Sequence, residues 1–368
     1  MDYKNPKLIL DSSQTPSGKI RWRSPSNIAL VKYWGKHGQQ LPRNPSISLT
    51  LSQAASDTTI TYSPKKNEAQ TIDLDFYFTG AARPDFAKRI VTFLEGLLPV
   101  YPFLRQLHFK IDSSNSFPHS AGIASSASAM SALALCLCSL EQRFFGTLTD
   151  KAAFLQKASY LARLGSGSAS RSVYPYVAVW GKTPAIKDAN DLFAIPYAVE
   201  VHEEFRSFHD DILIISKAEK SVSSRAGHQL MEGNLYADNR YTQAHRRLDR
   251  LKDAMRAGDL TTFGQITEAE ALTLHALMMT SQPPYLLMEA NSLTTIRKVQ
   301  AFRQDTGHPI YFTLDAGPNL HLLYPNSCAE PVKAFIRSEL TPLCNEGLYI
   351  ADRCGAGPEE LEPTTDEG

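Results

Sequence analysis

Hydrophobic and polar residues alternate along several stretches of the first 110 residues. The alternation covers 47–51, 58–62 and 72–78, and it returns at 107–111, while the strand-like pattern itself begins near Ile20. Side chains along a β-strand point to opposite faces in turn, so a period of two predicts strands that are buried on one side. The first part of the chain is therefore predicted to be rich in strands.

Apolar residues at helical spacing fall between and after these strands. A helix is predicted over 84–97, a small-residue helix from the end of a Ser/Gly/Ala loop to about residue 140, and another helix over 150–163. Thr149 or Asp150 is the candidate cap of the third helix, and Gly165 is its stop.

A second half is predicted to open with an apolar run at 210–215. Strands and helices mix along the whole chain without regular βαβ alternation, so the sequence favours an α+β fold with a boundary near 185–210. The other elements predicted around and after that boundary are a strand at 176–180, helices from about 235 to 305, strands at 310–314 and 320–324, a helix at 330–339 and a strand near 347–350.

Both ends of the chain are polar. Residues 1–20 are predicted to form an extension outside the core, and residues 356–368 an acidic, disordered tail. The beginning of the chain lacks the apolar core of a signal peptide, and no apolar run is long enough to cross a bilayer. The chain is accordingly predicted to be cytoplasmic.

Composition adds one constraint on ligands. The chain is 43% hydrophobic and 21% charged, and its 38 Lys and Arg residues balance 38 Asp and Glu residues. No global field therefore favours a nucleic acid or an anionic membrane as a partner. Any anionic ligand must be held by a local cluster of donors. The five cysteines show neither a disulfide framework nor a zinc pattern, so we expect reduced thiols.

A small-residue loop at 118–127 runs into the predicted helix that ends near residue 140. Small residues let the backbone approach an anion closely, and the free N–H groups at a helix start favour phosphate. Ser125 and Ser126 add hydroxyl groups that can reach phosphate oxygens or Mg²⁺. The loop is not a Walker sequence, since no Gly-Lys-Ser/Thr follows. A helix start packed under a sheet also fits the composition.

Two further loops place hydroxyl groups beside an arginine. In 165–172 two glycines, several serines and Arg171 form a candidate nest for a carboxylate or phosphate, although a helix stop followed by a loop explains the same residues. Segment 221–227 repeats the arrangement with Ser224 and Arg225, and a capped helix start is its alternative explanation. Together they indicate a ligand with several negative charges.

The remaining candidates are a lysine-containing strand and an acidic turn. Lys32 is flanked by apolar residues in 27–36, and a partly buried ammonium requires an anionic partner unless its side chain extends to solvent. In 311–319 an apolar run ends on Asp315, followed by Ala-Gly-Pro-Asn. Asp315 can be an ordinary turn acid, or a base or electrostatic anchor facing a cleft.

Taken in order, these five segments resemble the diphosphomevalonate decarboxylase branch of the GHMP kinase superfamily. The matching stretches are NIA-x-x-KYWGK at 27–36, the phosphate loop, GSGSASRS at 165–172, VSSRAG at 222–227 and DAGPN at 315–319. The resemblance implies an α+β, GHMP kinase-like fold in two domains with the active site in the cleft between them. The N-terminal ATP-binding domain, 21–198, would be like domain 2 of ribosomal protein S5, and the C-terminal domain, 199–355, would be ferredoxin-like.

The resemblance also implies roles for individual positions. Asp315, Lys32 and Arg171 would be catalytic, and Ser126 would also contact Mg²⁺. The residues that would hold the substrate are Ala29, Tyr33, Lys36, Ser166, Gly167, Ser168, Arg171, Ser224, Arg225 and Ala316. The residues that would surround ATP are Asn115, Pro118, Ala121, Gly122, Ile123, Ala124, Ser125 and Ser126.

The implied activity is ATP-dependent phosphorylation of a tertiary hydroxyl, followed by decarboxylation of (R)-5-diphosphomevalonate to isopentenyl diphosphate in isoprenoid biosynthesis. ATP and Mg²⁺ would be required, and a homodimer is expected. The alternatives are a mevalonate 3-kinase, a phosphomevalonate decarboxylase, a GHMP kinase for a sugar or homoserine, and a non-catalytic protein on the same scaffold. Retention of Lys32 and Asp315 favours the full reaction.

Overall fold

A mixed sheet forms the first half of the molecule in the computed structural model, which describes residues 3–11, 16–66, 70–118, 123–218 and 221–362. Its strands run in the order β14-β1-β4-β7-β5-β6, with β8 pairing the other part of β4 and β9 pairing β8. All of these pairs are antiparallel except β5 with β7. The strands are β1 (Gly18–Val31), β4 (Ser46–Pro64), β5 (Asp73–Phe78), β6 (Ala81–Ala82), β7 (Leu107–Asn115), β8 (Val177–Trp180), β9 (Ile195–Pro196) and β14 (Glu359–Leu361).

The two stretches predicted at 47–51 and 58–62 are parts of one long strand, β4. A break in its register with β1 lies between Pro25 and Asn27, and it lets one strand pair with different neighbours along its length. The sequence did not show that the two stretches are continuous, because the residues between them are mostly polar. A β-bulge also shifts the alternation of buried and exposed side chains by one position.

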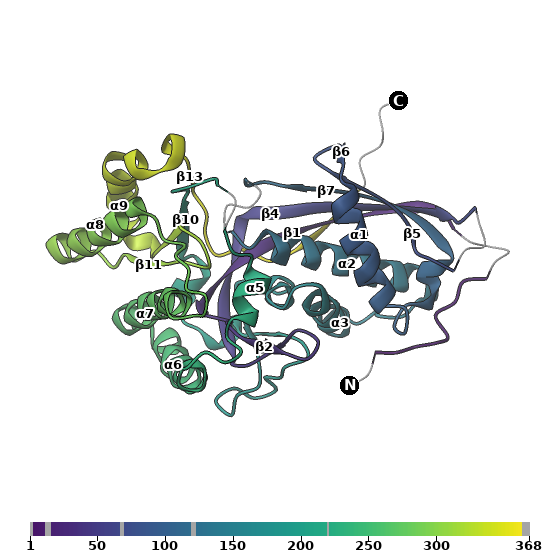
Figure 1. Ribbon diagram of the computed structural model, residues 1–368, viewed down its shortest axis with the longest axis horizontal. Helices are drawn as coiled ribbons and strands as arrows, with labels where there is room; N and C mark the ends of the chain where they lie inside the picture. The colour runs from purple at the N-terminus through teal and green to yellow at the C-terminus, as the bar shows by residue number, and fades with distance from the viewer. Residues whose placement is uncertain (1–2, 12–15, 67–69, 119–122, 219–220, 363–368) are drawn as a thin grey trace.

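Helices from the first half lie together beside this sheet (Figure 1). The predicted helices are all present, with Asp150 capping α3 by accepting a hydrogen bond from Ala153 N–H at 2.7 Å. Helix α2 packs against β1, β4 and α3. The helices are α1 (Pro84–Gly96), α2 (Ser125–Phe145), α3 (Lys151–Gly165) and the short α4 (Ala169–Ser172).

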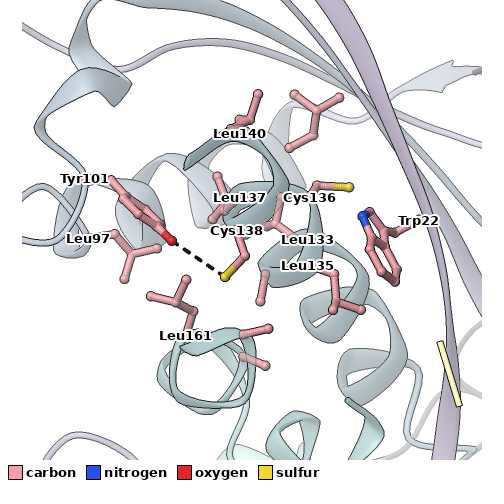
Figure 2. Close-up of a cluster of buried hydrophobic side chains, with 14 of the residues drawn as sticks. Trp22, Leu97, Tyr101, Leu133, Leu135, Cys136, Leu137, Cys138, Leu140 and Leu161 are labelled. Carbon is pink, nitrogen blue, oxygen red and sulfur yellow. Dashed lines mark hydrogen bonds between the residues drawn. The ribbon is translucent and has the colours of Figure 1, made fainter. Parts of the chain in front are cut away.

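The hydrophobic core around α2 contains two cysteines that point to different sides of the helix (Figure 2). Cys138 lies 3.6 Å from the Tyr101 hydroxyl oxygen, whereas the Cys136 thiol donates to the Thr58 carbonyl. All five cysteines of the chain are free and buried. Burial raises the pKa of the Cys138 thiol to about 12, so it packs as a small apolar group.

The second half contains a four-stranded antiparallel sheet in the order β11-β12-β10-β13, with α7 and α8 packed on β11. The helix predicted at 330–339 is α9 continued by a π-helical turn at Ile336–Leu340. The other elements are β2 (Lys36–His37), β3 (Leu41–Pro42), β10 (His209–Leu213), α5 (Ser224–Gln229), α6 (Ala237–Ala257), α7 (Leu260–Met279), α8 (Ala290–Thr306), β11 (Tyr311–Thr313), β12 (Leu320–Tyr324), α9 (Ala329–Phe335) and β13 (Tyr349–Ile350). Within the described ranges no helix has the length and apolar character that crossing a bilayer requires.

Two predictions about the chain ends were wrong. Leu8 and Leu10 are buried in the hydrophobic core of the first half. The side-chain amide of Gln106 accepts the Leu10 N–H and donates to the Leu10 carbonyl, both at 2.8 Å. Glu359–Leu361 forms β14 against Arg21–Arg23 of β1. Both end segments are polar on average, which is why they were predicted to lie outside the core. Two buried leucines at one end and a strand pairing at the other are enough to hold such a short segment in place. Residues 363–368 lie outside the described ranges.

Candidate active site

A cavity of about 500 Å³ is lined by segments from both halves of the chain. The five predicted segments, far apart in sequence, all contribute to its wall. The predicted residues that line it are Ala29, Lys32, Tyr33, Lys36, Ala124, Ser126, Ser166, Gly167, Ser168, Arg171, Ser224, Arg225, Asp315 and Ala316. We call this space the polar cavity.

Lys32 and Asp315 form an ion pair at the wall of the polar cavity. The Lys32 ammonium lies 2.8 Å from Asp315 Oδ1, and Lys32 is only 1% exposed whereas the Asp315 side chain is 28% exposed. The anionic partner expected for a buried lysine is therefore present. Asp315 follows β11, and its backbone carbonyl lies 3.1 Å from His275 Nε2 on α7. The acid thus remains open to a ligand on one side.

A buried carboxylate fixes the backbone of Lys32. Glu270 on α7 accepts the Lys32 N–H at 2.8 Å and binds both terminal nitrogens of Arg240 at 2.7 and 2.6 Å. Arg240 in turn donates to the Lys32 carbonyl at 3.1 Å, and Arg247 also binds Glu270. Sequence analysis missed this cluster because its members read as ordinary charged residues of two helices.

Arg171 is a buried cation surrounded by neutral acceptors. It is 2% exposed and donates to Asn27 Oδ1, Ser48 Oγ and Ser46 Oγ at 3.3, 3.1 and 2.7 Å. Burial lowers its pKa to about 10, while the charge of Asp315 acts in the opposite direction. A buried guanidinium held by hydroxyl and amide oxygens suits a negatively charged ligand.

Tyr33 and Lys36 also line the polar cavity, and their polar groups have hydrogen-bonding capacity left for a ligand. The buried Tyr33 hydroxyl makes no hydrogen bond within the described part of the chain, and burial raises its pKa. The Lys36 ammonium lies 3.1 Å from Gln40 Oε1, and burial together with Arg225 lowers its pKa. Gly167 is required nearby, since a Cβ there would lie 2.8 Å from the Tyr33 hydroxyl.

His228 is a residue of the polar cavity that sequence analysis missed. Its Nδ1 accepts the Gly35 N–H at 3.0 Å, and its ring lies 4.3 Å from the ring of Tyr33 and 4.6 Å from that of Trp34. Burial, with a contribution from Lys36, lowers its pKa to about 3. The spacing of a single histidine after VSSRAG does not mark it as a site residue. Only its packing in the folded chain shows that it lines the cavity.

The phosphate-loop residues occupy several environments. Helix α2 begins at Ser125, preceded by Ala124 in a left-handed conformation with φ 46°, and Ser126 Oγ lies 3.2 Å from Ser166 Oγ. Ile123 is buried, and its carbonyl accepts the Ser26 hydroxyl at 2.7 Å. Pro118 is half-buried and lines neither cavity. Ala121 and Gly122 lie outside the described residues.

A second cavity, of about 480 Å³, adjoins the first and is largely apolar. Asn115, Ser125 and Ser126 line it together with aromatic and aliphatic side chains of β5, α1 and α2 that the sequence indicated only as core positions. We call it the apolar cavity. The residues lining both cavities are Gln40, Arg89, Ser126, Gly165 and Arg225.

Basic side chains are concentrated around the polar cavity, and two of them, Arg89 and Arg225, also line the apolar cavity. Of the side chains that line the polar cavity, five are basic, namely Lys32, Lys36, Arg89, Arg171 and Arg225, and one, Asp315, is acidic. The described residues contain no group of three or more His, Cys, Asp or Glu arranged to hold a metal ion. The pair of cavities thus suits a polyanionic ligand beside a ligand with both apolar and anionic parts.

Comparison with known proteins identifies the family. The model described as diphosphomevalonate decarboxylase-like N-terminal domain matches residues 24–191, and that of the mevalonate 5-diphosphate decarboxylase C-terminal domain matches 211–358. The diphosphomevalonate decarboxylase of Aspergillus fumigatus is 31% identical over 87% of this chain and 80% of its own length. That of Saccharomyces cerevisiae is 31% identical over 85% and 79%.

Solved structures agree with this assignment. Mevalonate diphosphate decarboxylase from Staphylococcus aureus superposes with a TM-score of 0.79 at 29% identity, covering 95% of this chain and 99% of that one. The enzyme from Enterococcus faecalis gives 0.78 at 28%, covering 95% and 100%. The predicted α+β, two-domain GHMP kinase-like fold is thereby confirmed, while the division at residues 198 and 199 stays a prediction. The chain belongs to the diphosphomevalonate decarboxylase family.

Proposed function

We propose that this chain converts ATP and (R)-5-diphosphomevalonate to isopentenyl diphosphate, ADP, phosphate and CO₂ in the mevalonate route of isoprenoid biosynthesis. Family membership supports the reaction, and so does a solved relative described as a complex with MVAPP, AMPPCP and magnesium. The observation that carries the proposal is the Lys32–Asp315 pair in a cavity with four other basic side chains. A homodimer in the cytoplasm stays a prediction.

Each acidic end of the substrate has a matching group in the polar cavity. We assign the diphosphate to Lys36, Arg225 and the Ser166–Ser168 turn, where hydroxyl groups and cations lie together. Arg171 would bind the carboxylate of the substrate. Its guanidinium is buried and planar, and within the described residues no carboxylate forms an ion pair with it. The tertiary hydroxyl would then lie beside Asp315.

The chemistry follows from this placement. Asp315 orients the tertiary hydroxyl, or accepts its proton, while the oxygen attacks the γ-phosphorus of ATP; Lys32 holds Asp315 in position through the 2.8 Å contact. Departure of the new phosphate leaves an electron-poor carbon, and cleavage of the bond to the carboxylate supplies the electron pair of the new C=C bond as CO₂ leaves. The exposed side of the Asp315 carboxylate would then face that developing positive charge and stabilise it.

ATP would span both cavities. We assign its base to the apolar cavity and its phosphates to the start of α2, where Ser125 and Ser126 meet Arg89 and Arg225. The Ser126 hydroxyl would contact Mg²⁺, which takes its other oxygen ligands mainly from phosphates and water. Bound Mg²⁺ would neutralise phosphate charge during transfer.

Product analysis tests the assignment directly. Incubation with ATP, Mg²⁺ and diphosphomevalonate should release CO₂ and ADP in a one-to-one ratio. ADP without CO₂ would identify a kinase, and a preference for monophosphomevalonate would identify the related decarboxylase.

The Asp315→Ala variant should lower kcat at least about 100-fold, because it removes the group that orients the hydroxyl. Its melting temperature should fall, because Lys32 is only 1% exposed and loses its anionic partner, so kcat is measured at a temperature where the variant is fully folded. Asp305→Ala changes an exposed aspartate of α8 and is the control. Near-normal turnover by the Asp315→Ala variant would remove Asp315 from the mechanism.

A further inference from the structure

His228 stands at the wall of the polar cavity in a fixed orientation. It belongs to the short helix α5, which lies between the two halves of the molecule (Figure 1). Its ring is placed against Tyr33 and Trp34, and Gly227 lets α5 approach closely, since a Cβ there would lie 2.6 Å from Trp34. His228 as a whole is 8% exposed. Its position is therefore set by packing before any ligand binds.

The hydrogen bond from Gly35 determines the tautomer of this ring. Nδ1 accepts the Gly35 N–H at 3.0 Å, so it carries a lone pair and the proton of the neutral ring must be on Nε2. The low pKa of His228 keeps the ring neutral across the physiological range. Across the described residues Nε2 has no hydrogen-bond partner, although the side chain lines the cavity. An N–H donor is thus available for a ligand.

We propose that the Nε2–H of His228 donates a hydrogen bond to the diphosphate of the substrate, beside Lys36. His228 lines the same cavity as Lys36, Arg225 and the Ser166–Ser168 turn, so a diphosphate held by those groups would face the ring. A neutral donor contributes directionality without adding a sixth positive charge to a cavity that already has five basic side chains. His228 is then a substrate-binding residue that favours a diphosphate. This inference rests on the proposed function.

Two substitutions separate this role from simple support of Gly35. The amide nitrogen of glutamine can occupy the place of Nε2, whereas the amide oxygen of asparagine can occupy that of Nδ1. His228→Asn therefore keeps an acceptor for Gly35 and loses the donor, and His228→Gln does the reverse. We expect His228→Asn to raise KM for diphosphomevalonate about tenfold with kcat and KM for ATP within about threefold, and His228→Gln to remain within about threefold throughout.

The control is His308→Asn, the same change at a histidine that lines neither cavity. A His228→Asn variant that matches the parent, or that binds diphosphomevalonate better than His228→Gln, would overturn the proposal and leave the ring as a support for Gly35. In the parent protein, the nitrogen-15 resonance of the His228 Nε2–H should shift when diphosphomevalonate is added. An unchanged resonance would also overturn the proposal, even if neither variant folds.

Failure of the proposed function gives a different result. If the parent protein neither binds diphosphomevalonate in calorimetry nor turns it over with ATP, the substrate assignment is wrong. If the parent does both and the His228→Asn variant does so equally well, only the role of His228 is wrong.

Discussion

The candidate site brings several charged side chains out of water, and each has a distinct compensation. Lys32 pairs with Asp315, Glu270 pairs with Arg240, and Arg171 relies on hydroxyl and amide oxygens. Buried cations with neutral partners are costly unless an anion completes the site. Arg171 is therefore the residue whose environment points most directly to an acidic ligand.

The Arg171→Lys variant tests whether planar geometry matters there as well as charge. A single ammonium cannot reach Asn27, Ser46 and Ser48 together, so buried acceptors lose their donor. We expect a loss of about 1–3 kcal/mol in the free energy of unfolding and a rise in KM for diphosphomevalonate of at least about tenfold. Urea titration and steady-state kinetics measure the two effects.

Arg297→Lys, at an exposed position of α8, is the matched control and should change neither quantity. If the Arg171→Lys variant keeps the parental KM, carboxylate recognition does not depend on the guanidinium fork.

At the scale of elements, two short helices present part of the site, since α4 carries Arg171 and α5 carries Arg225. Helix α5 has six residues and carries Arg225 and His228, so its stability depends on its ends more than on its length. Ser223 caps it by accepting the Ala226 N–H at 3.2 Å. The capped helix start and the ligand loop, which were alternatives for this segment, are thus compatible in one structure.

Removing that cap should affect binding, whereas removing a cap elsewhere should not. Ser223→Ala is expected to cost about 1 kcal/mol of stability and to raise KM for diphosphomevalonate, because fraying of α5 displaces Arg225. Asp150→Ala removes the cap of α3, at the end of that helix remote from the cavity, and should cost similar stability with KM unchanged.

Ser223→Asn should restore both the stability and KM of the parent, since asparagine is an equally good cap. A parental KM in the Ser223→Ala variant would show that α5 does not need its cap to position these residues.

At the scale of the whole molecule, the two halves share an apolar core and a cluster of buried acids. Ile28 and Ile47 of the first half pack in the same cluster as Ile212 and Phe263 of the second. Asp352 accepts backbone N–H groups of residues 52–54 in β4, and its own N–H is held by Asp211 at 3.2 Å. These contacts fix how the two halves are placed relative to each other, and therefore how the walls of the polar cavity are placed.

Asp211 makes this junction sensitive to pH. Burial raises its pKa to about 6, although the Tyr324 hydroxyl and the Asp352 N–H oppose the shift. The unfolded carboxyl titrates near pH 4, so the stabilising effect of the protonated form is complete below pH 4 and is lost as the pH rises through 6. We expect the parent to lose about 2 kcal/mol relative to Asp211→Asn between pH 4 and pH 7.

Urea unfolding at several pH values measures this difference. The amide of asparagine stays neutral, so the Asp211→Asn variant lacks this one titration, and Asp305→Asn at an exposed position should follow the parent. Parallel stability profiles of the parent and the Asp211→Asn variant would show that Asp211 does not titrate in this range.

The sequence by itself determined most of the longer elements and the family, and through the family resemblance it predicted that the five segments converge. Period-two alternation and helical spacing are local properties, so they predicted the strands and helices well, with β4 divided only by its bulge. Lys32 was recognised because a charge within an apolar strand requires a partner, and Asp315 was the partner that the family resemblance supplied.

Only the tertiary structure decided which unremarkable residues complete the site. His228, Arg89 and Glu270 have no distinctive spacing, and their roles arise from contacts with Gly35, with both cavities and with the Lys32 backbone. Leu8, Leu10 and β14 likewise gain their places from contacts with segments that are distant in the sequence. Local pattern reports which face of an element is apolar, whereas burial and hydrogen-bond partners depend on which distant element covers it.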